Sequence, residues 1–205
     1  MPSTLAALRA IHAGLRACRR CPAMCDKPVH GAAIDTRILL VGQAPGAHEG
    51  SLGKPFAHKA GKTLFRWLES ATGADEEGIR EMVYFSAIAR CFPGKAKGAG
   101  DRPPSRQEIE NCRPHLQAEI KALEPKLILA VGRMAIAELL GEKQTKAPLT
   151  DLVGKKFRLQ ACEVDAVVIP LPHPSGVSRW PVTEPGKTKL AEALKLVREE
   201  FRKYA

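Results

Sequence analysis

The chain has 205 residues, 44% of them hydrophobic and 26% charged, which is typical of a soluble globular protein. Its longest apolar stretches are too short to cross a bilayer, and the amino-terminal segment lacks the apolar core of a signal peptide. We therefore expect a single domain over residues 1–205, a monomer in the cytoplasm. Lys and Arg number 32 against 22 Asp and Glu, and this excess fits a nucleic-acid partner as well as it fits a solvated basic surface.

Hydrophobic periodicity predicts helices that alternate with strands along the chain. Helices are expected at residues 3–17, 60–73, 105–124, 133–141 and 187–203. Strands are expected at residues 36–43, 81–91 and 125–132, with one or two more within 156–175. Ser105 with Glu108 three residues later is the pattern of a capping box. The alternation indicates a mainly parallel sheet layered between helices.

Ligands of such sheets bind at the carboxyl ends of the strands. The turns after ILLVG, VYFSAIARC and VVIPLP are therefore candidate walls of a site. Two segments imitate a phosphate-binding P-loop, AGKT at 60–63 and PGKT at 185–188. That motif needs a glycine five residues before its Gly-Lys pair, where these segments have Phe56 and Pro181. A P-loop is thus excluded.

The cysteines indicate a metal centre. Cys18 and Cys21 form a C-x-x-C pair, Cys91 is expected at a strand end, and Cys112 lies in the next helix. Four thiolates suit Zn²⁺ or an iron–sulfur cluster, and their spacing does not choose between the two. Cys25 could replace one of the four, Cys162 is expected in the core, and four unrelated buried thiols are the plain alternative.

Four segments, in this order, resemble the iron–sulfur branch of the uracil-DNA glycosylase superfamily: LLVGQAPGAHEGSLGKPFAHKAGKTLFRWLES, VYFSAIARCFPG, NCRPHLQAEIKALEPKLILAVGR and PLPHPSG. The resemblance extends from Cys18 to about Arg179. It implies a three-layer α/β/α fold with a four-stranded, mainly parallel sheet. It also implies that Cys18, Cys21, Cys91 and Cys112 bind a [4Fe–4S] cluster, and that uracil-containing DNA is the substrate.

The same resemblance implies roles for individual residues. The GQAPG turn would hold a flipped pyrimidine, Phe56 would stack on that base, and His173 would donate a hydrogen bond to it as negative charge develops. The base-binding set would be Gly42, Ala44, Pro45, Gly46, Phe56 and Ser175. Contacts with DNA would come from Lys95, Lys97, Arg102, Arg179 and Val177, the last as a wedge.

Two positions depart from the best-known thermophilic members, which carry Glu where Gln43 stands and Asn where Ala87 stands. Another branch with broader substrates has Ala at the second position and an Ala-His pair like Ala47-His48. The group that orients the attacking water is therefore left open among Gln43, His48 and Glu49. Two other functions also remain open: a catalytically silent nucleic-acid-binding module that kept the cluster, and a zinc-stabilised hydrolase of nucleosides.

Overall fold

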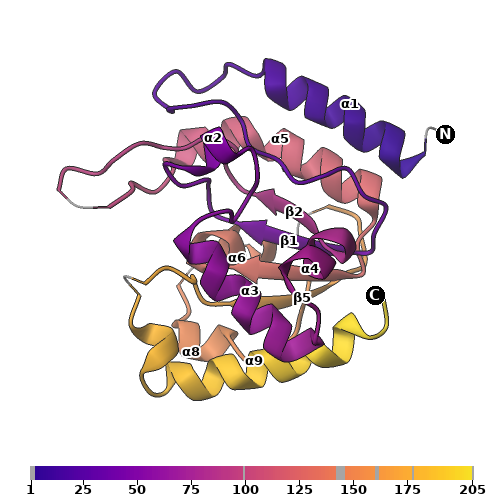
Figure 1. The fold of residues 1–205 in the computed structure, drawn as a ribbon, viewed down its shortest axis with the longest axis vertical. Helices are drawn as coiled ribbons and strands as arrows, with labels where there is room; N and C mark the ends of the chain where they lie inside the picture. Colours follow the sequence, from indigo (N-terminus) through magenta and orange to yellow (C-terminus); the bar gives the residue numbers. More distant parts are fainter. Residues whose placement is uncertain (1–2, 99, 142–145, 160–161, 177, 205) are drawn as a thin grey trace.

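The computed structural model describes residues 3–98, 100–141, 146–159, 162–176 and 178–204. They form an α/β fold around one sheet with strand order β2-β1-β3-β5-β4 (Figure 1). Strand β1 (Ile38–Gly42) pairs in parallel with β2 (Tyr84–Ala87) and with the central strand β3 (Leu127–Val131), and β3 pairs in parallel with β5 (Val167–Leu171). The predicted parallel sheet is confirmed.

The predicted number of four strands is too small by one. A two-residue strand, β4 (Phe157–Arg158), adds to the free edge of β5 in antiparallel direction. The sequence placed one or two strands within residues 156–175, and the structure contains both. So short a strand has no alternating pattern to read, because two residues show no period.

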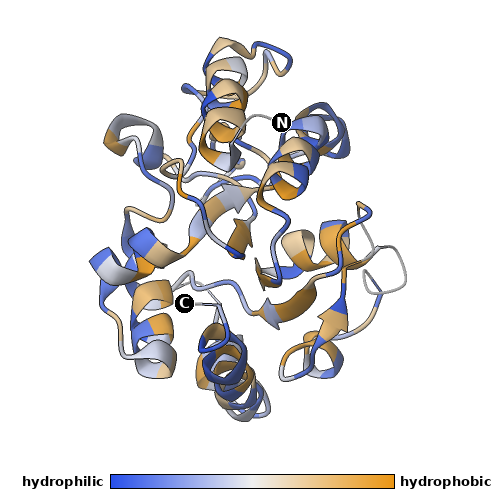
Figure 2. Ribbon diagram, turned by 90° about the vertical axis from the view of Figure 1, so that its right-hand side faces the viewer, coloured by the Kyte–Doolittle hydropathy of each residue, from blue (hydrophilic) through white to orange (hydrophobic). Residues whose placement is uncertain are grey.

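Helices cover both faces of the sheet and make the fold three-layered. One face packs against α3 (Lys59–Thr72), α4 (Glu76–Met82) and α9 (Gly186–Phe201). The other face packs against α1 (Thr4–Ala17), α5 (Arg106–Leu123) and α6 (Arg133–Leu140). Figure 2 shows mainly hydrophobic colours on the central strands and hydrophilic colours on the outer sides of the helices. A sheet covered on both faces explains why the strand segments read as continuous apolar runs.

Each expected helix is present within one to two residues of its predicted ends, and the capping box of Ser105 and Glu108 is formed. The sequence did not predict the short elements α2 (Glu49–Leu52), α4, α8 (Leu149–Leu152) and the 3₁₀ turn η1 (Trp180–Val182). No helix among the described residues has the length and apolarity needed to span a membrane.

The second strand is shorter than expected at both ends. Helix α4, which Asp75 caps by accepting a bond from the Gly78 amide, takes up its first residues. The strand then ends at Ala87, so that Cys91 lies four residues beyond it instead of at its end. Beyond Ala87 the chain follows the turn after β1: the amides of Ile88 and Ala89 donate to the carbonyls of Gly42 and Gln43, each at 3.0 Å. This pairing anchors the turn that the sequence singled out.

Candidate active site

A cavity of about 680 Å³ opens at the carboxyl edge of the parallel strands. Its walls are the segments after β1, β2 and β5, which are the three turns predicted to form a site. Its lining includes Gly42, Gln43, Ala44, Pro45, Gly46, His48, Glu49, Phe56, Ala87, His173 and Ser175. The structure thus brings all the proposed catalytic and base-binding residues to one cavity.

Phe56 is held in an unusual backbone conformation beside the turn. Its φ of 54° lies in the left-handed region, which costs a non-glycine residue energy and persists only where neighbours enforce it. Arg80 enforces it in part, because its guanidinium donates to the Pro55 carbonyl at 3.1 Å and to the Phe56 carbonyl at 3.5 Å. The ring lies against Gly42, where an added Cβ would be only 2.7 Å from the Phe56 Cζ. Phe56 therefore forms a fixed aromatic wall directly beside the turn.

Glu49 connects the turn to the segment that carries Phe56. Its amide donates to the Gly46 carbonyl at 3.1 Å, and its buried carboxylate lies near the backbone of Gly46, Phe56 and Ala57. Burial raises the pKa of Glu49, and this backbone and the Arg80 charge oppose the rise. Glu49 therefore links two walls of the cavity, the turn after β1 and the segment that carries Phe56. Of the three residues considered for orienting water, Glu49 is the one that holds the cavity walls in position.

His48 lies at the mouth of the cavity and is paired with a residue that the sequence did not suggest. The rings of His48 and His58 are 4.4 Å apart and tilted by 46°, and both residues line the cavity. Both are exposed. Nothing in the pattern GKPFAHKAG distinguishes His58 from any exposed histidine at the start of a helix, so only its location in the fold reveals it.

His173 is oriented by the backbone that follows it. The Ser175 amide donates to His173 Nδ1 at 3.2 Å, so Nδ1 is an acceptor and the neutral ring carries its proton on Nε2. Burial lowers the pKa of His173, which favours this neutral form. The ring packs on Gly132, where an added Cβ would be 3.1 Å from the His173 Cδ2. His173 can therefore offer one hydrogen bond from Nε2 without carrying a charge.

The basic loop between β2 and α5 forms another wall of the cavity. Lys95 binds Asp101 at 2.6 Å, and Asp101 lies against Gly46 of the turn, 3.5 Å from where a Cβ would be. Arg102, expected to contact DNA, instead binds both carboxylate oxygens of Glu108 at 2.8 and 2.6 Å. This contact lowers the pKa of Glu108 to about 2. Arg102 thus supports the capping box of α5. The position of Asp101 beside the turn could not be predicted from the sequence.

Of the other residues proposed for DNA binding, three are exposed on the surface. Lys95 and Lys97 are exposed on this loop, and Arg179 is exposed beyond β5. Val177, the proposed wedge, lies outside the described residues.

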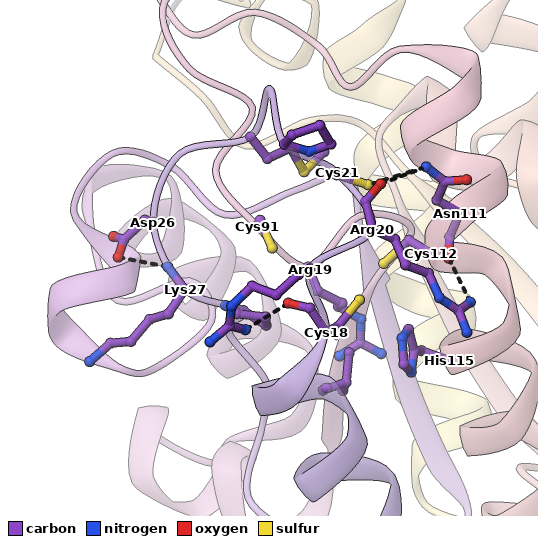
Figure 3. A pocket seen from close by; sticks show the side chains of 15 residues that line it. Cys18, Arg19, Arg20, Cys21, Asp26, Lys27, Cys91, Asn111, Cys112 and His115 are labelled. Carbon is purple, nitrogen blue, oxygen red and sulfur yellow. Dashed lines mark hydrogen bonds between the residues drawn. The ribbon is translucent and has the colours of Figure 1, made fainter.

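A second cavity, of about 480 Å³, is lined by the four cysteines predicted to bind a metal (Figure 3). Cys18 follows α1, Cys21 lies in the next loop, Cys91 follows β2, and Cys112 belongs to α5. Burial and then the neighbouring thiols raise the pKa of Cys91 to about 12. Segments far apart in the chain therefore meet at these sulfurs.

The other two cysteines lie elsewhere. Cys25 is exposed and pairs by its backbone with Phe92, and Cys162 packs beside the core on the α5 and α6 side. Within the described ranges, no three His, Cys, Asp or Glu side chains converge closely enough to share one metal ion. Two buried nitrogens that lack a hydrogen-bond partner in the described structure, Arg90 Nη1 and His115 Nε2, belong to residues that line the cysteine cavity.

A family model for the uracil DNA glycosylase superfamily matches residues 28–198. The chain belongs to the uracil-DNA glycosylase superfamily. The type-4 uracil-DNA glycosylase of Pyrobaculum aerophilum is 30% identical over 182 residues, which are 85% of this chain and 86% of the relative. That of Thermotoga maritima is 32% identical over 175 residues, 80% of each chain. A type-5 uracil-DNA glycosylase of Thermus thermophilus is 34% identical over 116 residues, 52% of this chain and 50% of the relative.

The similarity to the type-4 enzymes thus extends over most of the chain, whereas the similarity to the type-5 enzyme covers about half. The superfamily match includes both the GQAPG turn and His173, which line the candidate active site. It begins after Cys18 and Cys21, so these two cysteines lie outside it, whereas the longer of the pairwise similarities covers 85% of the chain.

Proposed function

We propose that the protein hydrolyses the N-glycosidic bond between uracil and deoxyribose in DNA and leaves an abasic site. The observation that carries the proposal is the meeting of an aromatic wall, a glycine-rich turn and a neutral histidine in one cavity of a superfamily member. Relatives similar over most of the chain are named uracil-DNA glycosylases, which supports the same substrate here. The excess of basic residues fits a DNA partner.

Base capture comes first. The target nucleotide is rotated out of the stack at a cost of a few kcal/mol, and Phe56 offers a π-face that partly restores the lost stacking. Its restrained backbone presents the ring without a further ordering cost, because Arg80 and Glu49 already fix it. The turn at 42–46 brings backbone groups close to the base, since neither Gly42 nor Gly46 has a side chain to keep it away.

Bond cleavage then places negative charge on the leaving base. His173 Nε2 would donate to that base, and the bond strengthens as the charge develops, so it stabilises the transition state more than the ground state. A neutral donor suits this role, because the low pKa of His173 keeps a cation out of a buried site. Gln43 and His48 are the two candidates for orienting the attacking water, while Glu49 positions the walls between which they lie.

Phosphate contacts would come from the exposed cations beside the cavity, Lys95, Lys97 and Arg179. Arg102 would act indirectly, by holding the loop that carries the two lysines to the start of α5.

A [4Fe–4S] cluster held by Cys18, Cys21, Cys91 and Cys112 is part of the proposal. The four thiols line one cavity yet do not converge on a point, which suits a multi-iron cluster with a separate iron for each thiolate better than a single Zn²⁺. Arg90 Nη1 and His115 Nε2, which lack a hydrogen-bond partner among the described residues, could donate hydrogen bonds to the sulfurs of such a cluster. Such a cluster would supply structural cross-linking, tying the end of α1 to α5 and to the basic loop.

The decisive experiment is single-turnover cleavage of a uracil-containing oligonucleotide, followed by alkali treatment to cut abasic sites. The wild-type protein should cleave, and His173→Ala should slow the chemical step by roughly 100-fold, the effect of one lost oxyanion donor. Binding of an uncleavable uracil analogue should weaken much less in His173→Ala, because the interaction grows with charge. Phe56→Ala should weaken both binding and rate, because stacking precedes cleavage.

The alternative function is a catalytically silent nucleic-acid-binding module, which the apolar Ala87 at the cavity wall favours. Binding of DNA without any cleavage would establish this alternative. A His173→Ala protein that cleaves at the wild-type rate would place the anion stabiliser on the backbone of the turn instead.

A further inference from the structure

Arg90 is a fully buried cation that lies between the two cavities. It is 1% exposed and belongs to the segment that joins β2 to Cys91. Its Nε donates to the Ala87 carbonyl at 3.0 Å, and its Nη2 donates to the Ser86 hydroxyl at 2.5 Å and forms an ion pair with Glu119. Ser86 and Ala87 both line the candidate active site. One side of the guanidinium thus holds a wall of the candidate active site in place.

The partners on that side are themselves rigid. Glu119 is completely buried, and its carboxylate also accepts bonds from Tyr84 Oη at 2.7 Å and from Ser86 Oγ at 2.8 Å. The network connects the last turns of α5 to β2, so Arg90 has no freedom to turn toward another partner. Its orientation is set by three groups of the fold, the Ala87 carbonyl, the Ser86 hydroxyl and the Glu119 carboxylate.

The other side of the guanidinium faces the cysteines. Arg90 lines the cysteine cavity together with Cys91 and Cys112. Its Nη1 is buried and has no partner among the described residues. A buried guanidinium N–H without an acceptor is rare in native proteins and calls for a group that is absent from the protein atoms alone.

We propose that Arg90 is a positioning residue that joins the two sites: its Nη1 donates a hydrogen bond to a sulfur of the iron–sulfur group, while Nε and Nη2 hold the base-cavity wall at Ala87 and Ser86. This inference rests on the proposed [4Fe–4S] cluster. It goes further, because it gives the cluster a defined contact with the wall that meets the flipped base. His115, whose Nε2 is also unpartnered, would be a second donor from the α5 side.

Two measurable consequences follow from this geometry. A hydrogen bond to a cluster sulfur stabilises the more negative, reduced state, so loss of the donor should lower the reduction potential. Loss of the Nε bond to Ala87 should loosen the wall, so capture of the base should weaken by about 2- to 10-fold, the scale of one hydrogen bond. Lysine keeps the charge opposite Glu119, but its single nitrogen cannot reach three directions at once.

The experiment compares full-length wild type, Arg90→Lys and the control Arg198→Lys, all purified without air. Arg198 is a suitable control because its guanidinium also donates to backbone carbonyls, those of Ser70 and Ala71, and it lines neither cavity. Iron content, the midpoint potential of the cluster and the dissociation constant for DNA with an uncleavable uracil analogue are measured for each. Only Arg90→Lys should show a lower potential together with weaker capture, at unchanged iron content.

The outcomes separate this inference from the proposal beneath it. Wild-type protein without iron would remove the cluster proposal, and the contact with Arg90 would fall with it. A cluster that is present, with a potential unchanged by Arg90→Lys, would overturn the contact and leave the cluster standing. A lower potential with unchanged capture would overturn the connection between the sites. If Arg90→Lys does not fold, the pair Arg90→Gln and Glu119→Gln removes both buried charges together, and the absence of either shift in that variant overturns the inference.

Discussion

Gly42 is the residue at which an added methyl group should strongly reduce cleavage, because it lies against Phe56 in the candidate active site. It ends β1, and a Cβ at this position would lie 2.7 Å from Phe56 Cζ and 3.1 Å from Cε2. Ordinary carbon–carbon contacts begin near 3.5 Å, so Gly42→Ala should displace the end of the Phe56 ring by roughly 0.8 Å or more. The backbone of Phe56 cannot follow, because Glu49 and Arg80 hold it on either side.

A displacement of this size matters because catalysis depends on the position of the captured base. A misplacement of about 1 Å can cost roughly 100-fold in rate, so we expect Gly42→Ala to lose between about 10- and 100-fold in single-turnover cleavage. The fold should survive, since the strand itself accepts alanine. The matched control is Gly14→Ala in α1, where a Cβ would have no neighbour within 4 Å. That variant should keep full activity and gain a little stability, about 0.5–1 kcal/mol.

The same experiment in a Phe56→Ala background tests the mechanism of the loss. If Gly42→Ala acts through the ring, it should cost nothing further once the ring is absent, and the double-mutant cycle should show strong coupling. Equal losses in the two backgrounds would refute the reasoning, because they would mean that the methyl group disturbs the turn or the base directly.

Three further predictions concern the cluster, the DNA contact and the acid range. The protein should be brown with about four iron atoms per chain; Cys112→Ala should bleach it and Cys162→Ala should not, as judged by iron analysis and visible absorption. Lys97→Glu should reduce the slope of log affinity against log salt, and an unchanged slope would show that this exposed lysine does not meet phosphate. Burial, with the charges of nearby cations, lowers the pKa of His12 from 6.5 to about 4. The unfolded chain therefore binds this proton first, and stability that is complete above pH 6.5 should decrease as the pH falls, by roughly 2 kcal/mol at pH 5. His12→Gln should lack this part of the pH dependence in urea unfolding, and an identical dependence in both proteins would exclude it.

The sequence was sufficient for the elements whose patterns are long. The amphipathic helices α5 and α9 lie where periodicity placed them, because sixteen or more residues with one apolar face leave few alternatives. The strands β1, β3 and β5 lie within their predicted segments because each is a short, continuous apolar run. The strand order and β4 could not be read in the same way. They depend on pairing between residues far apart in the chain, which no local pattern records.

The site was predicted unevenly, for a physical reason. Phe56 and His173 were proposed because their motifs carry a resemblance, and the structure places both at one cavity. The sequence named Glu49 as a candidate for orienting water, but it could not show that this carboxylate lies buried beside the backbone of the turn and of Phe56, because that placement depends on the fold. The charge of Arg102 suggested a phosphate contact, which stays a prediction, and the fold shows that the same charge holds Glu108. Charge shows what a side chain can bind, and only the fold shows what it does bind.

The departures at Gln43 and Ala87 both lie at the wall of the candidate active site, so they bear on how a base is selected. Ala87 stands at the end of β2 on the cavity wall, and the two amides that follow it are already bound to the turn. Ala87 therefore offers the base edge no side-chain donor or acceptor, and the neighbouring Ser86 hydroxyl is already bound to Glu119 and Arg90. A site that recognises a polar edge rejects analogues strongly because its own groups would be left unpaired, whereas an apolar wall imposes no such penalty. Under the proposed function, selection of the base would then fall to the backbone of the turn and to Gln43 and His173, which would bind carbonyl oxygens common to several deaminated bases. Rejection of normal bases would depend more on the cost of extruding a correctly paired nucleotide than on the cavity itself.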